Sequence, residues 1–136
     1  MKLLTFQASH FSWSPHLRTV DDAPEVSEGG EVHDAVVAWL HVEAADEADE
    51  ARVFRHTLKH IKWIANKRGF ENVVLHFFAH LGGINADPEF ARGFIERLGK
   101  RLADTGYIVS LTPFGYFCAW DLDVYGDSLA KVFKSI

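Results

Sequence analysis

The chain has 136 residues, of which 48% are hydrophobic and 24% charged, a balance typical of one globular domain and not of a disordered or fibrous protein. Its formal net charge of −5 disfavours a generally basic nucleic-acid-binding protein. The single cysteine, Cys118, excludes an internal disulfide and a thiolate zinc cluster, and no stretch approaches the roughly 20 apolar residues of a membrane span, so we expect a cytosolic protein.

The first part of the chain predicts two strands and an exposed connection. Residues 2–8 (KLLTFQA) form a short apolar run expected to be a buried strand. Residues 10–30 are rich in Ser, Pro, Asp and Glu and end in two glycines, which indicates an exposed excursion or an irregular hairpin. Residues 32–42 (VHDAVVAWLHV) are too apolar for a solvated face, so we expect a second strand inside a sheet.

The region from residue 43 to residue 69 predicts a helix preceded by an acidic segment. Beyond residue 50, apolar side chains recur at spacings of four, three and four residues, as on one buried face of a helix. These side chains are Phe54, Leu58, Ile61 and Ala65. Gly69 is expected to end the helix.

A third strand and a second helix are predicted next. Residues 72–80 (NVVLHFFAH) are an apolar run typical of a buried strand, and the glycines at 82 and 83 allow close approach to a neighbour. Asp87 and Pro88 have the character of an N-cap residue and a first-turn proline. The buried stripe of this helix comprises Phe90, Phe94, Leu98 and Leu102, and Gly106 ends it.

The C-terminal region predicts two strands and a short helix. Residues 107–111 and 116–124 are the strands, joined by a turn at 113–115. Residues 126–128 are expected to start a terminal helix that carries Leu129, Val132 and Phe133. The complete order is β-β-α-β-α-β-β-α in one domain over residues 1–136, an α/β fold in which helices cover a mixed sheet.

Motifs of common catalytic sites are missing. There is no G-x-S-x-G elbow and no Gly-rich phosphate loop, and Cys118 lies between aromatic residues, where a thiol is usually a packed side chain. His56 and His60 have the spacing of a metal-binding pair, but no glutamate lies between them, and Lys59 and Lys62 beside them are typical of a solvated face. We therefore expect no metal and no nucleotide cofactor.

Two segments each place an aromatic ring and a backbone turn at an edge of the predicted sheet. Residues 77–82 (FFAHLG) end one strand and residues 113–117 (PFGYF) begin another. Ligands usually bind at such edges in α/β folds. The polar His80 beside glycines favours a site, although the pattern alone leaves open that these are two well-packed turns.

These segments carry a resemblance to a known family. Residues 78–81 (FAHL) and 113–116 (PFGY), at this separation and after an MKLL-type first strand, resemble the archaeal threonyl-tRNA synthetase editing domain. The similarity covers essentially the whole chain, because residues 40–47 (LHVEAADE) and 126–130 (GDSLA) also have counterparts in the family. It implies a D-aminoacyl-tRNA deacylase-like fold and, usually, a homodimer.

The resemblance also implies an activity in protein biosynthesis. Family members hydrolyse the ester of L-seryl-tRNA(Thr), either as part of the synthetase or as a separate chain, and the tRNA ribose hydroxyl helps to position the attacking water. Serine lacks one methyl group of threonine, and a binding pocket can use such a difference for only about 1–3 kcal/mol, so a second, proofreading site is needed. An aminoacyl ester is activated, so orientation and oxyanion stabilisation can suffice without a nucleophilic side chain.

The family's binding residues fall on a small set of positions in this chain. The resemblance implies that His80 acts at the site and that Val42 lines the adenosine subsite. The remaining positions of the pocket are Ala79, Gly115, Tyr116, Phe117 and Cys118. Ser9 and His10 correspond more loosely to a polar segment near the substrate amino group.

Two positions depart from the family pattern. Cys118 stands where the family usually has a lysine, and Lys131 stands on the predicted terminal helix where the family usually has an acid. One hypothesis is that Lys131 supplies the missing ammonium group to the catalytic site. The alternative is that Lys131 is a solvated side chain.

Two other functions compete with seryl-tRNA editing. A D-aminoacyl-tRNA deacylase shares the fold, but its Gly-cisPro motif is missing because none of the four prolines follows a glycine. The second rival is a catalytically inactive tRNA-binding or dimerisation module, suggested by the cysteine at position 118.

The placement of charge predicts where tRNA binds. Residues 1–50 hold two bases and eleven acids, a net charge of −9, whereas residues 51–136 hold twelve bases and eight acids, a net charge of +4. The basic residues gather on the two predicted helices, with Arg55, Lys59 and Lys62 on the first. We expect these helices to face tRNA phosphates.

Overall fold

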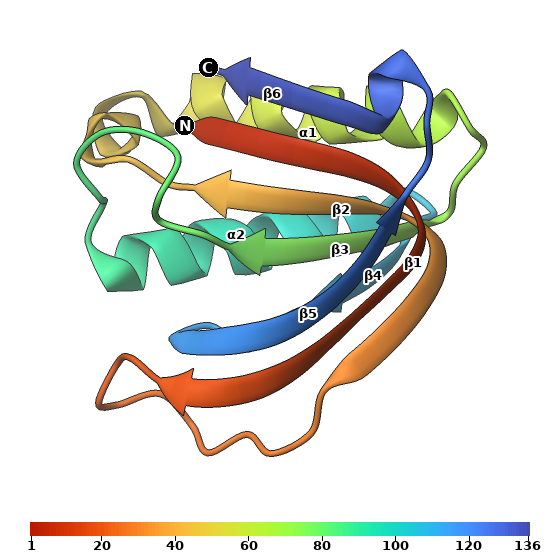
Figure 1. The fold of residues 1–136 in the computed structure, drawn as a ribbon. Coiled ribbons are helices and arrows are strands. Elements are labelled where there is room, and N and C mark those ends of the chain that lie inside the picture. The colour runs from red at the N-terminus through yellow and green to blue at the C-terminus, as the bar shows by residue number, and fades with distance from the viewer.

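The computed structural model describes residues 1–136 as a six-stranded sheet with two α-helices and two short 3₁₀ helices (Figure 1). The elements are β1 (Lys2–Arg18), β2 (Gly30–His41), η1 (Ala44–Asp49), α1 (Glu50–Asn66), β3 (Asn72–Phe77), α2 (Pro88–Asp104), β4 (Ile108–Leu111), β5 (Tyr116–Val124), η2 (Ser128–Ala130) and β6 (Lys131–Ser135).

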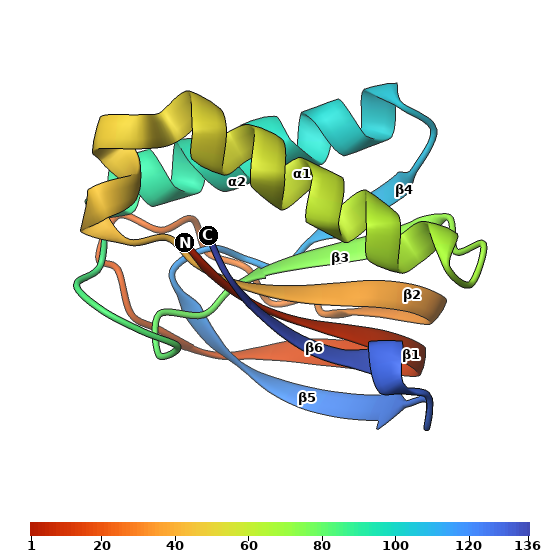
Figure 2. The same ribbon diagram turned by 90° about the horizontal axis from the view of Figure 1, so that it is seen from above.

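The sheet is mixed and its strand order is β4-β3-β2-β1-β5. β2 pairs with β3, and β3 with β4, in parallel, whereas β1 runs antiparallel to β2, β5 and β6. Both helices lie on one face of this sheet, as the view from above shows (Figure 2). The predicted α/β architecture is therefore confirmed.

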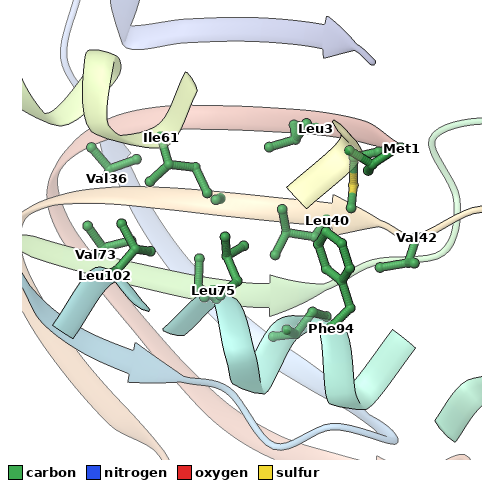
Figure 3. Close-up of a cluster of buried hydrophobic side chains, with 14 of the residues drawn as sticks. Met1, Leu3, Val36, Leu40, Val42, Ile61, Val73, Leu75, Phe94 and Leu102 are labelled. Carbon is green, nitrogen blue, oxygen red and sulfur yellow. The ribbon is translucent and has the colours of Figure 1, made fainter. Parts of the chain in front are cut away.

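The main core lies between the helices and the sheet. It contains 18 buried side chains, among them Leu40, Leu75 and Phe94 (Figure 3). The predicted helix faces point into it, because Ile61 and Ala65 of α1 and, on α2, Phe94, Leu98 and Leu102 are buried. Phe54, Leu58 and Phe90 are partly buried at its margin.

The predicted ends of the helices are also confirmed. The carboxylate of Asp87 accepts a hydrogen bond from the backbone N–H of Glu89 at 3.1 Å, and Pro88 occupies the first turn of α2. Gly69 and Gly106 follow the two helices with φ angles of 66° and 102°, a conformation that glycine adopts without steric cost. No helix is both long and apolar enough to cross a membrane.

The first strand is longer than predicted. β1 continues through the expected excursion to Arg18, and only residues 19–29 connect it to β2. Phe11 belongs to a second, smaller cluster on the sheet face that the helices leave open, and Trp13 packs against this cluster. The strand bends and exchanges neighbours: β6 pairs with Lys2–Phe6, whereas β5 pairs with residues 8–18 (Figure 1). Residues 10–30 are rich in polar residues, so the sequence pattern did not predict the second half of β1.

The predicted terminal helix is wrong. Residues 128–130 form a single 3₁₀ turn, and Lys131–Ser135 is a strand. Main-chain groups along the first half of β1 would otherwise lack partners on one side, and β6 supplies them. Val132 packs against the main core while Phe133 on the other face is exposed, the alternation of a strand.

Candidate functional site

A cavity of about 270 Å³ lies where β3 ends and β5 begins. Residues 77–80 and 115–117, which belong to the two segments that the sequence places at a sheet edge, line the cavity, and Thr19 and Val20 after β1 also contribute to its lining. The cavity opens on the helix-free face of the sheet. Along β3, Val73 and Leu75 enter the core beneath the helices, so His76 must point to the opposite face.

The structure brings six of the predicted pocket residues to this cavity. They are Ala79, His80, Gly115, Tyr116, Phe117 and Cys118. His80 is exposed, and its ring meets the ring of Phe78 edge to face, with centroids 5.2 Å apart. His80 is therefore free to contact a bound ligand.

Val42 and Lys131 are not brought to the cavity. Val42 is fully buried in the main core, and its carbonyl oxygen accepts a hydrogen bond from the N–H of Ala86 at 3.1 Å (Figure 3). Lys131 begins β6, beyond the far end of β5, and its ammonium group donates to the carbonyl oxygen of Tyr125 at 3.0 Å. About six strand residues, roughly 20 Å, separate Cys118 from that end of β5. This geometry favours the solvated alternative for Lys131.

His76 lines the cavity and was not singled out in the sequence. Its Nδ1 lies 2.7 Å from Oγ1 of Thr112, and burial lowers the pKa of the imidazole to about 4. The ring is therefore neutral at physiological pH. The sequence did contain a signal for this residue: His76 is a polar residue within the apolar run of β3. A buried polar group needs a hydrogen-bond partner, so such a residue indicates a specific contact.

Aromatic rings form one side of the cavity and continue beyond it. Trp120 packs against His76 edge to face at 5.1 Å and against Trp39 at 4.4 Å, and Phe78 lies 5.0 Å from Trp39. Such rings offer flat apolar surfaces on which a nucleobase can stack.

The segment from Gly115 to Cys118 combines structural and ligand-facing groups. Gly115 has a φ of 83°, its carbonyl oxygen accepts from the N–H of Thr19 at 2.7 Å, and an added Cβ would lie 3.1 Å from Cβ of Ala23. The hydroxyl of Tyr116 donates to the carbonyl oxygen of Pro24 at 2.7 Å, which fixes the loop after β1. Burial raises the pKa of the Cys118 thiol, so this side chain is not an activated nucleophile.

The predicted basic surface lies on α1, across the sheet from the cavity mouth. Arg55 and Lys59 are exposed and Lys62 is half-buried, and none of the three forms a salt bridge. Most bases of α2 are instead paired with acids, as in the Arg92–Glu96 pair. Unpaired positive charge is therefore concentrated on α1.

The two histidines of α1 have different environments. His56 is exposed as expected, but His60 is buried, with Nε2 3.5 Å from Oγ1 of Thr5. Burial and the nearby Lys134 charge lower the pKa of His60. The expectation of a solvated face is wrong at this position because α1 packs over β1 there.

Known proteins resemble the chain along its whole length. The family model described as the archaea-specific editing domain of threonyl-tRNA synthetase matches residues 1–136. The chain is 28% identical over 138 residues to threonine-tRNA ligase of Thermofilum pendens and 27% identical over 139 residues to that of Pyrococcus horikoshii. Each match covers 100% of this chain and 22% of the ligase.

A solved structure shares the fold. The c-Myc DNA unwinding element binding protein aligns with a TM-score of 0.70 over 100% of this chain and 99% of the other, at 13% sequence identity. The predicted D-aminoacyl-tRNA deacylase-like fold class is thereby confirmed.

Proposed function

Because the chain belongs to the archaea-specific editing domain family of threonyl-tRNA synthetase, we propose that it hydrolyses the ester bond of L-seryl-tRNA(Thr). The observation that carries the proposal is that residues 78–80 and residues 115–116, which belong to the two segments with the family resemblance, line one cavity. The aminoacyl group and the terminal adenosine occupy this cavity in our account.

The small cavity supports selectivity for serine. The walls at Ala79 and Gly115 belong to turns whose backbones lie close to the ligand space. A site that holds serine tightly excludes threonine by clash with its methyl group, and the correct product is thereby protected. This selection complements an aminoacylation site that gains only about 1–3 kcal/mol from the same methyl group.

The chemistry we propose relies on positioned groups and not on a nucleophilic side chain. Backbone N–H groups of the two turns stabilise the oxyanion, and the ribose hydroxyl of the tRNA helps to position water. His80 is exposed at the cavity and orients that water or the substrate. No ammonium group is used, because Cys118 replaces the family lysine and Lys131 lies at the far end of β5.

The experiment is a parallel deacylation assay with L-Ser-, L-Thr- and D-aminoacyl-tRNA. The proposal expects selective loss of L-Ser. Cleavage of D-aminoacyl-tRNA alone would assign the D-aminoacyl deacylase function, and tRNA binding without turnover would assign the inactive module. We expect His80→Ala to lower turnover by at least about tenfold and Lys131→Ala to leave it unchanged; near-normal turnover of His80→Ala would make that histidine structural.

We further propose that the chain acts in the cytoplasm as a homodimer, alone or with a threonyl-tRNA synthetase catalytic chain. Phe117 and Trp120 support the dimer, because both are large apolar side chains exposed on β5, the strand at one end of the sheet order. Light scattering in solution tests it, and a monomer at assay concentrations would contradict it.

A further inference from the structure

Three adjacent strands bring two histidines and three carboxylates together at a distance from the cavity. His10 of β1 lies opposite His33 of β2 and opposite Asp123 of β5. Two residues further along β1, Ser12 lies opposite Glu31 and opposite Asp121. The side chains of Phe11 and Trp13 pack on the helix-free face, so His10, which directly precedes Phe11, points to the opposite face of the sheet.

The imidazoles of His10 and His33 converge on one carboxylate oxygen. Nε2 of His10 lies 3.1 Å and Nε2 of His33 lies 2.9 Å from Oε1 of Glu31. The two rings are tilted against each other with centroids 5.0 Å apart. The three ligand atoms all lie within 4.8 Å of one another.

We propose that His10, Glu31 and His33 bind a divalent transition-metal ion, with Zn²⁺ as the preferred ion. Zn²⁺ takes imidazole nitrogen and carboxylate oxygen at about 2.0–2.2 Å in tetrahedral sites, which places neighbouring ligand atoms roughly 3.3–3.5 Å apart. The two nitrogen-to-oxygen distances need only a few tenths of an ångström of widening. Two imidazoles select Zn²⁺ and its neighbours in the transition series over Mg²⁺ and Ca²⁺, which prefer oxygen. Water completes the coordination.

The surroundings favour a cation. Asp121 and Asp123 approach His10 from β5, and their ligand oxygens form with a ring nitrogen of His10 a second group within 4.8 Å. These carboxylates raise the negative potential at the site. We assign them a supporting role, because the group that contains them offers one imidazole instead of two.

The place of the site in the fold gives it a structural consequence. The ion would join β1 to β2 where β1 leaves β6 and begins to pair with β5. The opposite end of the β1–β5 pair carries Tyr116 and Cys118 of the cavity wall. Metal binding would therefore stiffen the strands that hold the wall, without taking part in hydrolysis.

The test is titration of the full chain, without a histidine tag, with Zn²⁺ alone by calorimetry and with Co²⁺ by absorption spectroscopy. We expect one ion per chain, a visible Co²⁺ band of tetrahedral intensity and a higher unfolding temperature with metal. His10→Ala and His33→Ala should each weaken binding by more than about tenfold, whereas the control His16→Ala, at an exposed position of the same strand, should not.

Three results would overturn the assignment: no saturable binding, equal binding by the His10→Ala/His33→Ala double variant, or loss of binding in Asp121→Asn/Asp123→Asn with His33→Ala unaffected. Circular dichroism of each variant separates loss of a ligand from loss of the fold. The titration needs no tRNA, so its outcome is independent of the proposed editing activity.

Discussion

Nδ1 of His76 lies 2.7 Å from Oγ1 of Thr112, and this contact joins the buried end of β3 to the residue that follows β4. Both residues are buried, so neither polar group can turn to water. The pair anchors the strand end from which Ala79 and His80 enter the cavity.

Thr112→Val should destabilise the protein by about 1–3 kcal/mol, because it removes a partner of a buried imidazole without changing the volume of the side chain. Urea denaturation measures the change. The matched control is Thr57→Val, because Oγ1 of Thr57 is buried with no hydrogen-bond partner. The control should be neutral or stabilising, and equal losses in the two variants would contradict this account of the pair.

His76 should also make stability depend on pH. Its folded pKa of about 4 lies below the ordinary value of 6.5, so the unfolded chain binds the proton more readily than the folded chain. The stabilising contribution is complete above about pH 6.5 and is lost as pH falls towards about pH 4, a loss of about 2–3 kcal/mol.

Denaturation of His76→Gln at the two ends of this range checks that prediction. The variant should lose less stability between these two pH values than the unsubstituted protein. Burial also lowers the pKa of His60, and because His60 is present in both proteins, it accounts for the loss that they share. Identical pH profiles would show that His76 is not the titrating group.

The ionisation of Glu43 makes the stability of the fold depend on pH in a lower range. Its burial raises the pKa, but hydrogen bonds from the Lys2 ammonium group, the N-terminal ammonium group of Met1 and the Gly83 N–H outweigh burial and lower the pKa to about 2. The carboxylate therefore stabilises the fold above about pH 4.5, and this contribution is lost as pH falls to about 2.

Glu43→Gln should cost about 1–2 kcal/mol at neutral pH and flatten the loss of stability in that acid range. Acid titration followed by circular dichroism measures it. Glu47→Gln is a suitable control, because Glu47 is exposed and forms no salt bridge. An acid transition that is unchanged in Glu43→Gln would contradict the role given to this carboxylate.

Charge reversal on α1 tests the tRNA surface. Lys59 shares a hollow of about 360 Å³ with His56 and with Lys134 of β6, so positive charge on two elements can meet one phosphate. Arg55→Glu/Lys59→Glu should weaken tRNA binding and reduce its salt dependence. Arg92→Glu/Lys100→Glu changes the net charge equally, but at bases already paired with Glu96 and Asp104. Equal effects of the two double variants would reject a specific surface on α1.

Local signals in the sequence predicted local structure well. Asp87 and Pro88 predicted the start of α2, and the glycines at 69 and 106 predicted the helix ends, because capping depends on neighbouring residues. The terminal strand was mistaken for a helix because Leu129, Val132 and Phe133 fit a helical spacing. Residues 131–135 form a strand because they pair with the free edge of β1, which lies more than a hundred residues earlier in the sequence.

The candidate site was predictable only where a motif marked it. The segments at 78–81 and 113–116 led to the cavity, whereas the His76–Thr112 pair depends on the parallel pairing of β3 and β4. Convergence of His10, Glu31 and His33 likewise depends on the register of β1 and β2. The spacing of residues along the sequence does not show how β3 pairs with β4 or how β1 pairs with β2.

The central claim is that the cavity is the site of L-seryl-tRNA(Thr) hydrolysis, and filling the cavity tests it most directly. The measurement is the initial rate of L-Ser release by the unsubstituted chain and by Ala79→Leu, with Ala103→Leu as a control at an exposed position of α2. We predict rapid release by the unsubstituted chain and by Ala103→Leu, and loss of at least about two orders of magnitude in folded Ala79→Leu. Equal rates for all three proteins, or no release by the unsubstituted chain, would contradict it.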